Sequence, residues 1–157
     1  MGPEDRVLLR SLLVDERLLA LGLVAGGEPL AGLLPFAVAE DFSALYVQAS
    51  QLARHARGLT AGARFSGVVH RPDGPEADPL QIPRVILEGV VDPLESGRAE
   101  REAAVRGFVR RFPSAAMTLA LPDFSLYRLE IEAGRLVAGF GSASQLSATE
   151  FRALAGE

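Results

Sequence analysis

A short segment in the first half of the chain gathers side chains that are suited to binding an anion. Arg54 and Arg57 flank His55, and the hydroxyl of Ser50 precedes them by one helical turn. A planar guanidinium matches two phosphate oxygens at once, and an imidazole near neutral pH supplies either a charge or a neutral donor. The same spacing also fits a surface helix with solvated arginines, and the residues alone leave both interpretations open. The polar residues of this predicted phosphate cradle, residues 48–57, are Gln48, Ser50, Gln51, Arg54, His55 and Arg57.

The elements around this segment determine whether those side chains can converge. An apolar strand is predicted over residues 44–49 and a short helix over residues 50–58, with Ser50 as its N-cap and Gly58 as its C-terminal stop. A helix N-terminus presents free N–H groups and a partial positive charge, both of which favour a bound phosphate. We therefore expect the cradle at the junction of this strand and this helix.

The composition excludes several classes of chemistry. The chain has 157 residues and no cysteine, which removes disulfides, thiolate metal sites and cysteine nucleophiles. All 16 basic residues are arginine, so that no lysine is present to form a Schiff base. The two histidines and the carboxylates show no metal-ligand spacing, and no metal is expected. No side chain shows the pattern of a general acid, base or nucleophile, and none is assigned a catalytic role.

Charge and hydropathy predict the setting in which the protein works. A formal net charge of −4 argues against nucleic acid and anionic membranes as partners. The first residues lack the basic-then-apolar order of a signal peptide, and a Gly-Gly turn interrupts the apolar stretch over residues 18–39. We expect a soluble, cytoplasmic protein with no membrane span. The length fits a single domain over residues 1–157.

The rest of the pattern predicts a mainly β protein with short helices. A final hairpin is expected to turn at Ala133 and Gly134, and Ser147 with Glu150 forms a capping box that opens a last helix. Six or more strands with few helices favour a small β-barrel, because barrel closure removes exposed sheet edges. The other predicted elements are helices at 4–14, 96–112 and 114–120, and strands at 18–25, 29–38, 64–70, 84–91, 124–131 and 135–140.

Four stretches carry a further signal in their order and spacing along nearly the whole chain. They are Leu33-Leu34-Pro35-Phe36-Ala37, Ser50-Gln51-Leu52-Ala53-Arg54-His55, Pro83-Arg84-Val85-Ile86-Leu87-Glu88-Gly89, and Asp123-Phe124-Ser125-Leu126-Tyr127-Arg128-Leu129 with Gly139-Phe140-Gly141. This ordered set resembles the pyridoxamine phosphate oxidase-like superfamily of FMN-binding split barrels. It is most similar to the haem-utilisation branch of that superfamily.

The resemblance implies a split β-barrel that binds FMN. In that superfamily the junction of strand and helix holds the FMN phosphate with a hydroxyl and consecutive basic residues. Ser50, Arg54 and His55 fall on those positions, and Arg57 lies close by. The cradle is thereby interpreted as a flavin-phosphate site.

The resemblance also implies a homodimer with the flavin at its interface. Gln48 and Gln51 would lie near the phosphate or the ribityl chain. The flavin ring would pass along the backbone of residues 34–36. Arg84 falls where the partner subunit reaches the cofactor.

The function that the resemblance implies is that of an FMN-dependent oxidoreductase whose substrate is not specified. Oxidation of pyridoxamine phosphate is not expected, because the oxidases carry basic residues on the second strand where this chain is apolar. The haem-utilisation branch has threonine and asparagine where this chain has Ala56 and Gly58. The alternatives are a non-catalytic split barrel that binds haem or another small ligand, linked to haem utilisation, and a structural homodimer with no working pocket.

Overall fold

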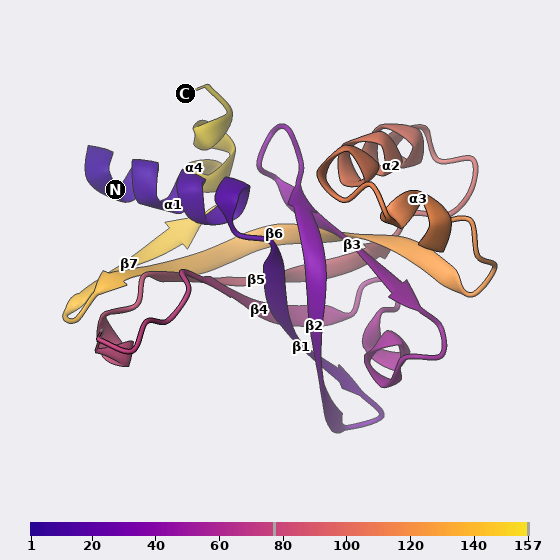
Figure 1. Cartoon of the computed structure of the whole chain (residues 1–157), viewed down its shortest axis with the longest axis horizontal. Helices are drawn as coiled ribbons and strands as arrows, with labels where there is room; N and C mark the ends of the chain where they lie inside the picture. Colours follow the sequence, from indigo (N-terminus) through magenta and orange to yellow (C-terminus); the bar gives the residue numbers. More distant parts are fainter. Residues whose placement is uncertain (77, 157) are drawn as a thin grey trace.

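A computed structural model describes residues 1–76 and 78–156 and contains an antiparallel β-barrel (Figure 1). Within these residues the strands run in the order β3-β2-β1-β4-β5-β6, and β3 also pairs with β6, which closes the barrel. Strand β7 extends the sheet beyond this closure. The predicted mainly β split-barrel fold is therefore confirmed. The strands are β1 (Leu18–Ala25), β2 (Glu28–Val38), β3 (Ala44–Ser50), β4 (Arg64–His70), β5 (Arg84–Pro93), β6 (Phe124–Gly139) and β7 (Ser142–Ser147).

The β1–β2 hairpin forms as its sequence predicts. Gly26 and Gly27 have φ angles of +58° and +79°, a left-handed pair that glycine adopts without steric strain. Ala25 pairs with Glu28 across this two-residue turn. The register that follows directs alternate leucines of β1 into the barrel, where they are buried.

Strand β6 corrects the prediction of a hairpin at Ala133 and Gly134, because both residues lie inside one strand of 16 residues. Position 134 needs glycine because the backbone of β5 and the ring of Phe151 lie too close for a side chain, and not because the chain turns there. A Cβ atom at Gly134 would lie 2.6 Å from the carbonyl oxygen of Ile86 and 2.7 Å from the ring of Phe151. The turn lies instead at Gly141, whose φ is +77°. The predicted strand at residues 135–140 is therefore a continuation of β6, and its antiparallel partner is β7.

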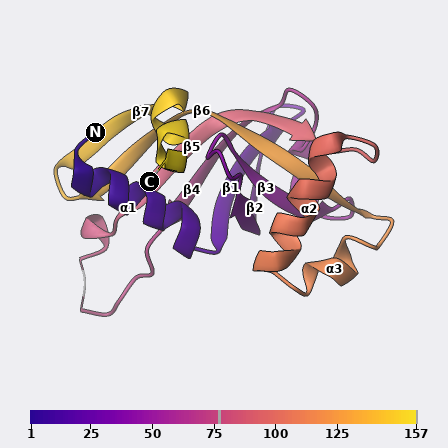
Figure 2. The ribbon, with the colours of Figure 1, turned by 90° about the horizontal axis from the view of Figure 1, so that it is seen from above.

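In the described part of the chain, four α-helices pack on the barrel in two groups (Figures 1 and 2). Helices α1 (Pro3–Asp15) and α4 (Ala148–Arg152) lie together, and their apolar side chains join the main core inside the barrel. Helices α2 (Ala99–Arg111) and α3 (Ala115–Thr118) lie together at the other end. They form a second core around Phe108, Phe112 and Leu126 on the outer side of the barrel.

The last helix begins with the predicted capping box. The Glu150 backbone N–H donates to the hydroxyl of Ser147, and the Ser147 N–H donates to the carboxylate of Glu150 at 2.9 Å. This reciprocal pair satisfies donors that a helix start would otherwise leave free. Within the described residues, no helix combines the length and the apolar character that a membrane span requires.

Candidate functional site

The first half of the predicted cradle lies at the end of β3, and its local structure corrects the helix predicted over residues 50–58. Ser50 is the last residue of β3 and pairs with Phe124 of β6, so that the strand continues through the expected N-cap. The Ser50 hydroxyl accepts the N–H of Leu52 at 3.1 Å, which closes a turn and not a helix. The helix that follows, η1 (Arg54–Gly58), is a 3₁₀ helix of five residues. A long-range strand pairing therefore overrides the local capping signal.

A carboxylate accompanies the hydroxyl of the cradle. Ser50 Oγ donates a hydrogen bond of 2.7 Å to Asp123 Oδ2, in the loop before β6. The N–H of Gln51 donates to the backbone carbonyl of the same Asp123. The hydroxyl proton of Ser50 is thus directed to a protein acceptor.

The two predicted glutamines are held by side chains from other elements. Gln48 Oε1 accepts from Thr118 Oγ1 of α3 at 2.8 Å. Gln51 Nε2 donates to the Tyr127 hydroxyl at 2.6 Å and to Ser125 Oγ at 3.3 Å. These contacts bring Gln48, Ser50 and Gln51 together at the junction of β3, β6 and α3.

The two arginines of the cradle converge on one oxygen atom. Arg54 Nη2 lies 3.8 Å from Glu28 Oε2, and Arg57 Nη1 lies 3.6 Å from the same atom. Glu28 is the first residue of β2, and all three side chains are more than half exposed. Exposed ion pairs contribute little to stability, so that this contact is readily exchanged for another anion.

His55 occupies a different environment from the arginines on either side of it. Its ring packs on Gly32 of β2, where a Cβ atom would lie 2.9 Å from both Cγ and Nδ1 of the imidazole. Its Nε2 atom is buried and has no hydrogen-bond partner in the described part of the chain. The structure therefore places His55 against the barrel wall, between two exposed guanidinium groups.

Arg84 lies far from the cradle within one chain. It begins β5 and pairs with Val137, whereas Ser50 pairs with Phe124, so that roughly 40 Å of β6 separates the two pairs. Arg84 Nη1 donates to the carbonyl of Ile82 at 3.0 Å. The side chain also borders a cavity of about 360 Å³ beside the β6–β7 turn, together with Arg135 and Phe140.

Sequence reasoning missed the carboxylates that complete the cradle. Glu28 and Asp123 come from the start of β2 and from the loop before β6, and neither stands near residues 48–57 in the sequence. Only the pairing of β3 with β6 and the packing of η1 on β2 bring them to the site. Among residues 1–76 and 78–156, no group of three or more histidine, aspartate or glutamate side chains is placed to hold a metal ion.

Comparison with known proteins gives one family and many similar folds. The family described as CREG, beta-barrel, matches residues 27–153. No curated protein matches the chain. A haem-binding protein from Mycobacterium smegmatis superposes with a TM-score of 0.83 at 24% identity, over 98% of this chain and 62% of its own. This chain is therefore less than two thirds as long as that relative.

Two further solved structures share the fold. The haem storage protein HutZ from Vibrio cholerae has a TM-score of 0.71 at 23% identity, over 79% of this chain and 87% of its own. The FAD- and haem-binding protein from Mycobacterium smegmatis has a TM-score of 0.64 at 20% identity, over 94% and 77% of the two chains. Likeness at this level of identity shows a common fold.

Proposed function

The chain belongs to the CREG β-barrel family, and from this premise we propose that it is a single-domain flavoprotein that binds FMN at residues 48–57. The observation that carries the proposal is the convergence of Arg54 and Arg57 on Glu28 Oε2. Two guanidinium groups that share one carboxylate oxygen can equally pair with the oxygens of a phosphate group. The donor set at this position therefore fits the phosphate end of FMN.

Charge decides which anion the arginine pair prefers. A phosphate monoester carries between one and two negative charges near neutral pH and offers three acceptor oxygens, whereas Glu28 offers a single charge. Because the ion pairs with Glu28 are exposed, little free energy opposes their replacement. The hydroxyl of Ser50 already donates to Asp123, so that Arg54 and Arg57 provide the main phosphate contacts.

The flavin would supply the redox chemistry, namely hydride or electron transfer, and the protein would orient the ring and exclude competing reactions. On this proposal the ring lies along β2 near residues 34–36, as the resemblance implies. His55 would act by fixing η1 on Gly32, which holds the flanking arginines in place. The proposed activity is that of an FMN-dependent oxidoreductase, with no side chain assigned to proton transfer.

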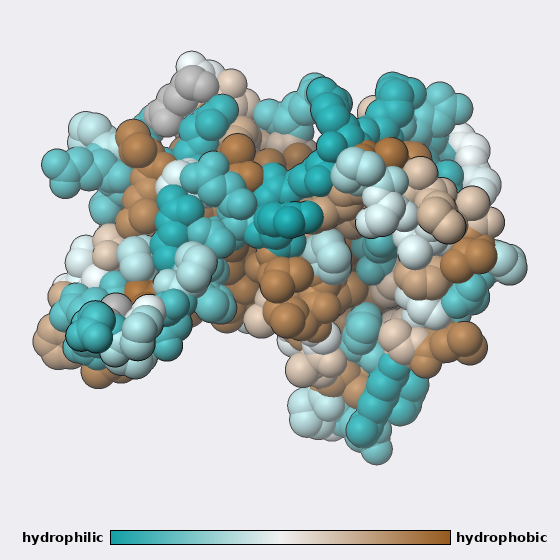
Figure 3. All heavy atoms as spheres, viewed as in Figure 1, coloured by the Kyte–Doolittle hydropathy of each residue, from teal (hydrophilic) through white to brown (hydrophobic). Residues whose placement is uncertain are grey.

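The outer face of β1 and β2 supports the homodimer that this site needs. Figure 3 shows hydrophobic atoms gathered over the two strands, and Leu33 and Val24 are 66% and 62% exposed. An antiparallel sheet whose outer face meets water normally carries polar residues there. An apolar outer face therefore indicates that another molecule packs on it. The outward positions are Leu18, Ala20, Gly22, Val24, Pro29, Ala31, Leu33 and Pro35.

The proposed cover is a second copy of this chain. The apolar face continues across paired strands from Leu33 through Ala20 and Val68 to Ile86, and Arg84 stands two residues from Ile86 on the same side. In a two-fold dimer, residues at one edge of this apolar face contact residues at the opposite edge of the same face on the second chain. Arg84 of one chain would thus approach the cradle of the other, which its distance within one chain forbids.

A charge on this face is expected to separate the dimer. Leu33→Glu buries an unpaired carboxylate in the proposed interface, and we expect the molar mass from light scattering to fall to that of one chain. Val7→Glu, on an equally exposed position of α1, serves as the control and should leave the mass unchanged. A wild-type protein that is monomeric at all concentrations would contradict the dimer.

Flavin binding tests the central proposal directly. FMN added to the purified chain should be bound with a Kd of about 1 µM or below, measured by quenching of flavin fluorescence. Riboflavin, which lacks the phosphate, should bind at least about tenfold more weakly, because it forgoes the charge-assisted contacts with the arginines. Equal affinity for FMN and riboflavin would contradict the assignment of the cradle as a phosphate site. If neither ligand binds, the proposal that the chain is a flavoprotein is wrong.

A haem-binding function is the second candidate, and one histidine favours it. The Nδ1 atom of His70 lies 2.7 Å from the carbonyl oxygen of Arg71. A carbonyl only accepts, so that Nδ1 carries the proton and the exposed Nε2 is left as the nitrogen that can bind a metal. A Soret band on addition of haem, without uptake of FMN, would favour this candidate over the flavoprotein. Failure to bind either would favour a structural homodimer.

A further inference from the structure

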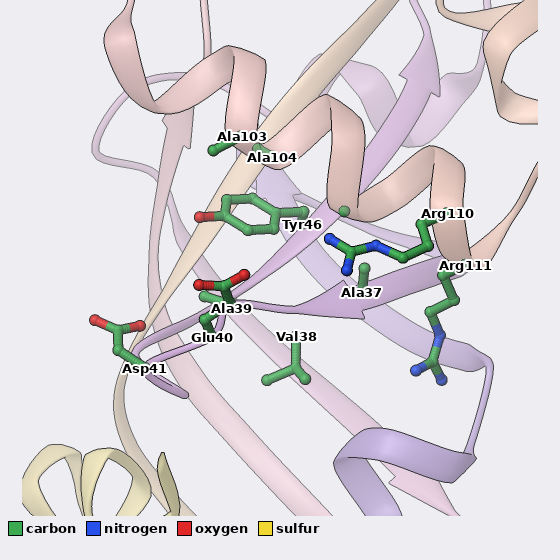
Figure 4. Close-up of a pocket in the computed structure, with 11 residues that line it drawn as sticks. Ala37, Val38, Ala39, Glu40, Asp41, Tyr46, Ala103, Ala104, Arg110 and Arg111 are labelled. Atoms are coloured by element: carbon green, nitrogen blue, oxygen red, sulfur yellow. The ribbon is translucent and has the colours of Figure 1, made fainter.

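A second cavity lies at the opposite end of β3 from the cradle. It measures about 650 Å³ and opens between α2 and the β2–β3 hairpin (Figure 4). This volume falls within the range of small-molecule sites. Besides Val38, its aliphatic lining consists of small residues, namely Ala37, Ala39, Ala103, Ala104 and Gly107.

Gly107 has no packing reason to be glycine. It stands inside α2, where glycine destabilises a helix relative to alanine. No heavy atom of the described structure lies within 4 Å of the position that its Cβ would take, apart from its own helix backbone and chain neighbours. By contrast, a Cβ at Gly134 would collide with a carbonyl oxygen. Gly107 borders the cavity, and a side chain at this position would have open space to enter.

Two opposite charges in the cavity are left without protein partners. Figure 4 shows Arg110 reaching from α2 toward the carboxylate of Glu40 on the hairpin. Neither side chain forms a hydrogen bond or an ion pair with another described residue, and both are exposed. Their neighbours are engaged elsewhere, since Asp41 accepts from Ser43 at 2.6 Å and Arg111 donates to the carbonyl of Val14 at 2.5 Å.

Tyr46 forms a fixed wall beside these charges (Figure 4). Its hydroxyl donates to Glu100 at 2.8 Å, and Glu100 also accepts from Arg128 Nε at 2.9 Å. Burial and the neighbouring Glu100 carboxylate raise the pKa of Tyr46 far above its ordinary value, so that the phenol stays neutral. The half-buried ring therefore offers an apolar surface without adding a charge.

We propose that this cavity binds a small zwitterion with an apolar body, the chemistry of an amino acid with a large apolar side chain. The carboxylate of the ligand pairs with Arg110, and its ammonium group pairs with Glu40. The apolar side chain lies against the small residues of α2 and β2 and the ring of Tyr46. The arrangement is independent of FMN, because none of the cradle residues borders this cavity.

Calorimetric titration of the full chain with L-phenylalanine tests the proposal. Saturable binding is expected with a Kd below about 1 mM. 3-Phenylpropionate lacks the ammonium group and phenethylamine lacks the carboxylate, and each should bind at least about tenfold more weakly, since each loses one charge-assisted contact. The absence of saturation by phenylalanine at about 10 mM would overturn the proposal.

Charge-neutral variants assign the two ends of the ligand. Arg110→Gln should weaken phenylalanine about tenfold while leaving phenethylamine unchanged. Glu40→Gln should weaken phenylalanine equally while leaving 3-phenylpropionate unchanged. Arg106→Gln, an exposed change on the same helix that does not border the cavity, is the matched control. Variants that weaken all three ligands alike would contradict the assigned orientation.

A variant that blocks the cavity tests this site independently of the proposed flavin site. Gly107→Leu places a side chain in the cavity and improves helix propensity, so that the midpoint of thermal unfolding should stay the same or rise while phenylalanine binding is lost. FMN binding by the same variant should match the wild type. Undiminished phenylalanine binding by Gly107→Leu would overturn the cavity as the site, whatever the outcome for FMN.

Discussion

Replacing Gly89 with alanine is expected to lower the free energy of unfolding by about 3 kcal/mol, the upper range for overpacking a closely packed position. A Cβ atom at Gly89 would lie 1.7 Å from the carbonyl oxygen of Glu130. Both atoms belong to paired strands, β5 and β6, at a shift of register between Glu88 and Gly89. The extra residue of this bulge, Glu132, lies on β6, so the backbone must move where β6 bends around the barrel.

Chemical denaturation with urea measures this effect, and Gly107→Ala provides a control of opposite sign. Alanine at Gly107 meets no atom outside its own helix and should raise the free energy of unfolding by about 0.5–1 kcal/mol. A loss of less than about 0.5 kcal/mol for Gly89→Ala would mean that the strands can separate locally without cost, against the register described above.

Removal of both cradle arginines is expected to give the largest change in ligand affinity. Arg54→Ala and Arg57→Ala should each weaken FMN by about 1.5 kcal/mol, or roughly tenfold, because each removes a charge-assisted contact with the phosphate. The double variant should lose about 3 kcal/mol, or roughly a hundredfold, if the two contacts are independent. Flavin fluorescence titration at low salt measures these changes, since salt screens exposed charges.

Two controls distinguish a phosphate contact from a general loss of positive charge. Glu28→Gln removes the carboxylate that shares the two arginines and should tighten FMN binding, an effect opposite to that of the arginine variants. Arg98→Ala removes an exposed arginine that pairs with Asp92 and should leave affinity unchanged. If the double arginine variant binds FMN as the wild type does, the cradle is not a phosphate site.

The sequence predicted the elements because their signals are local. The apolar runs over residues 18–25 and 29–38 and the Gly26-Gly27 turn between them predicted the first hairpin, and the turn has the left-handed φ angles that glycine permits. Ser147 and Glu150 predicted the start of α4 through a contact three residues apart. The count of strands favoured a barrel, and the barrel class is what the structure has.

Errors arose where one residue type satisfies two different requirements. The sequence pattern predicts Gly134 as a turn residue, but its lack of a side chain accommodates Ile86 and Phe151 inside β6. The sequence pattern predicts Ser50 as a helix cap, but it extends β3 by pairing with Phe124 and caps a turn. In both cases a contact between strands distant in sequence decided the outcome, and no local pattern contains that contact.

For the candidate site, the sequence determined the chemistry of residues 48–57, namely two guanidinium groups, an imidazole and a hydroxyl close together in the chain. Only the tertiary structure decided that Arg54 and Arg57 share Glu28, and that His55 turns to Gly32. It alone placed Arg84 at the far end of β6. The physical reason is barrel closure, because the pairing of β3 with β6 and the packing of η1 on β2 fix directions that a linear pattern of residues does not encode.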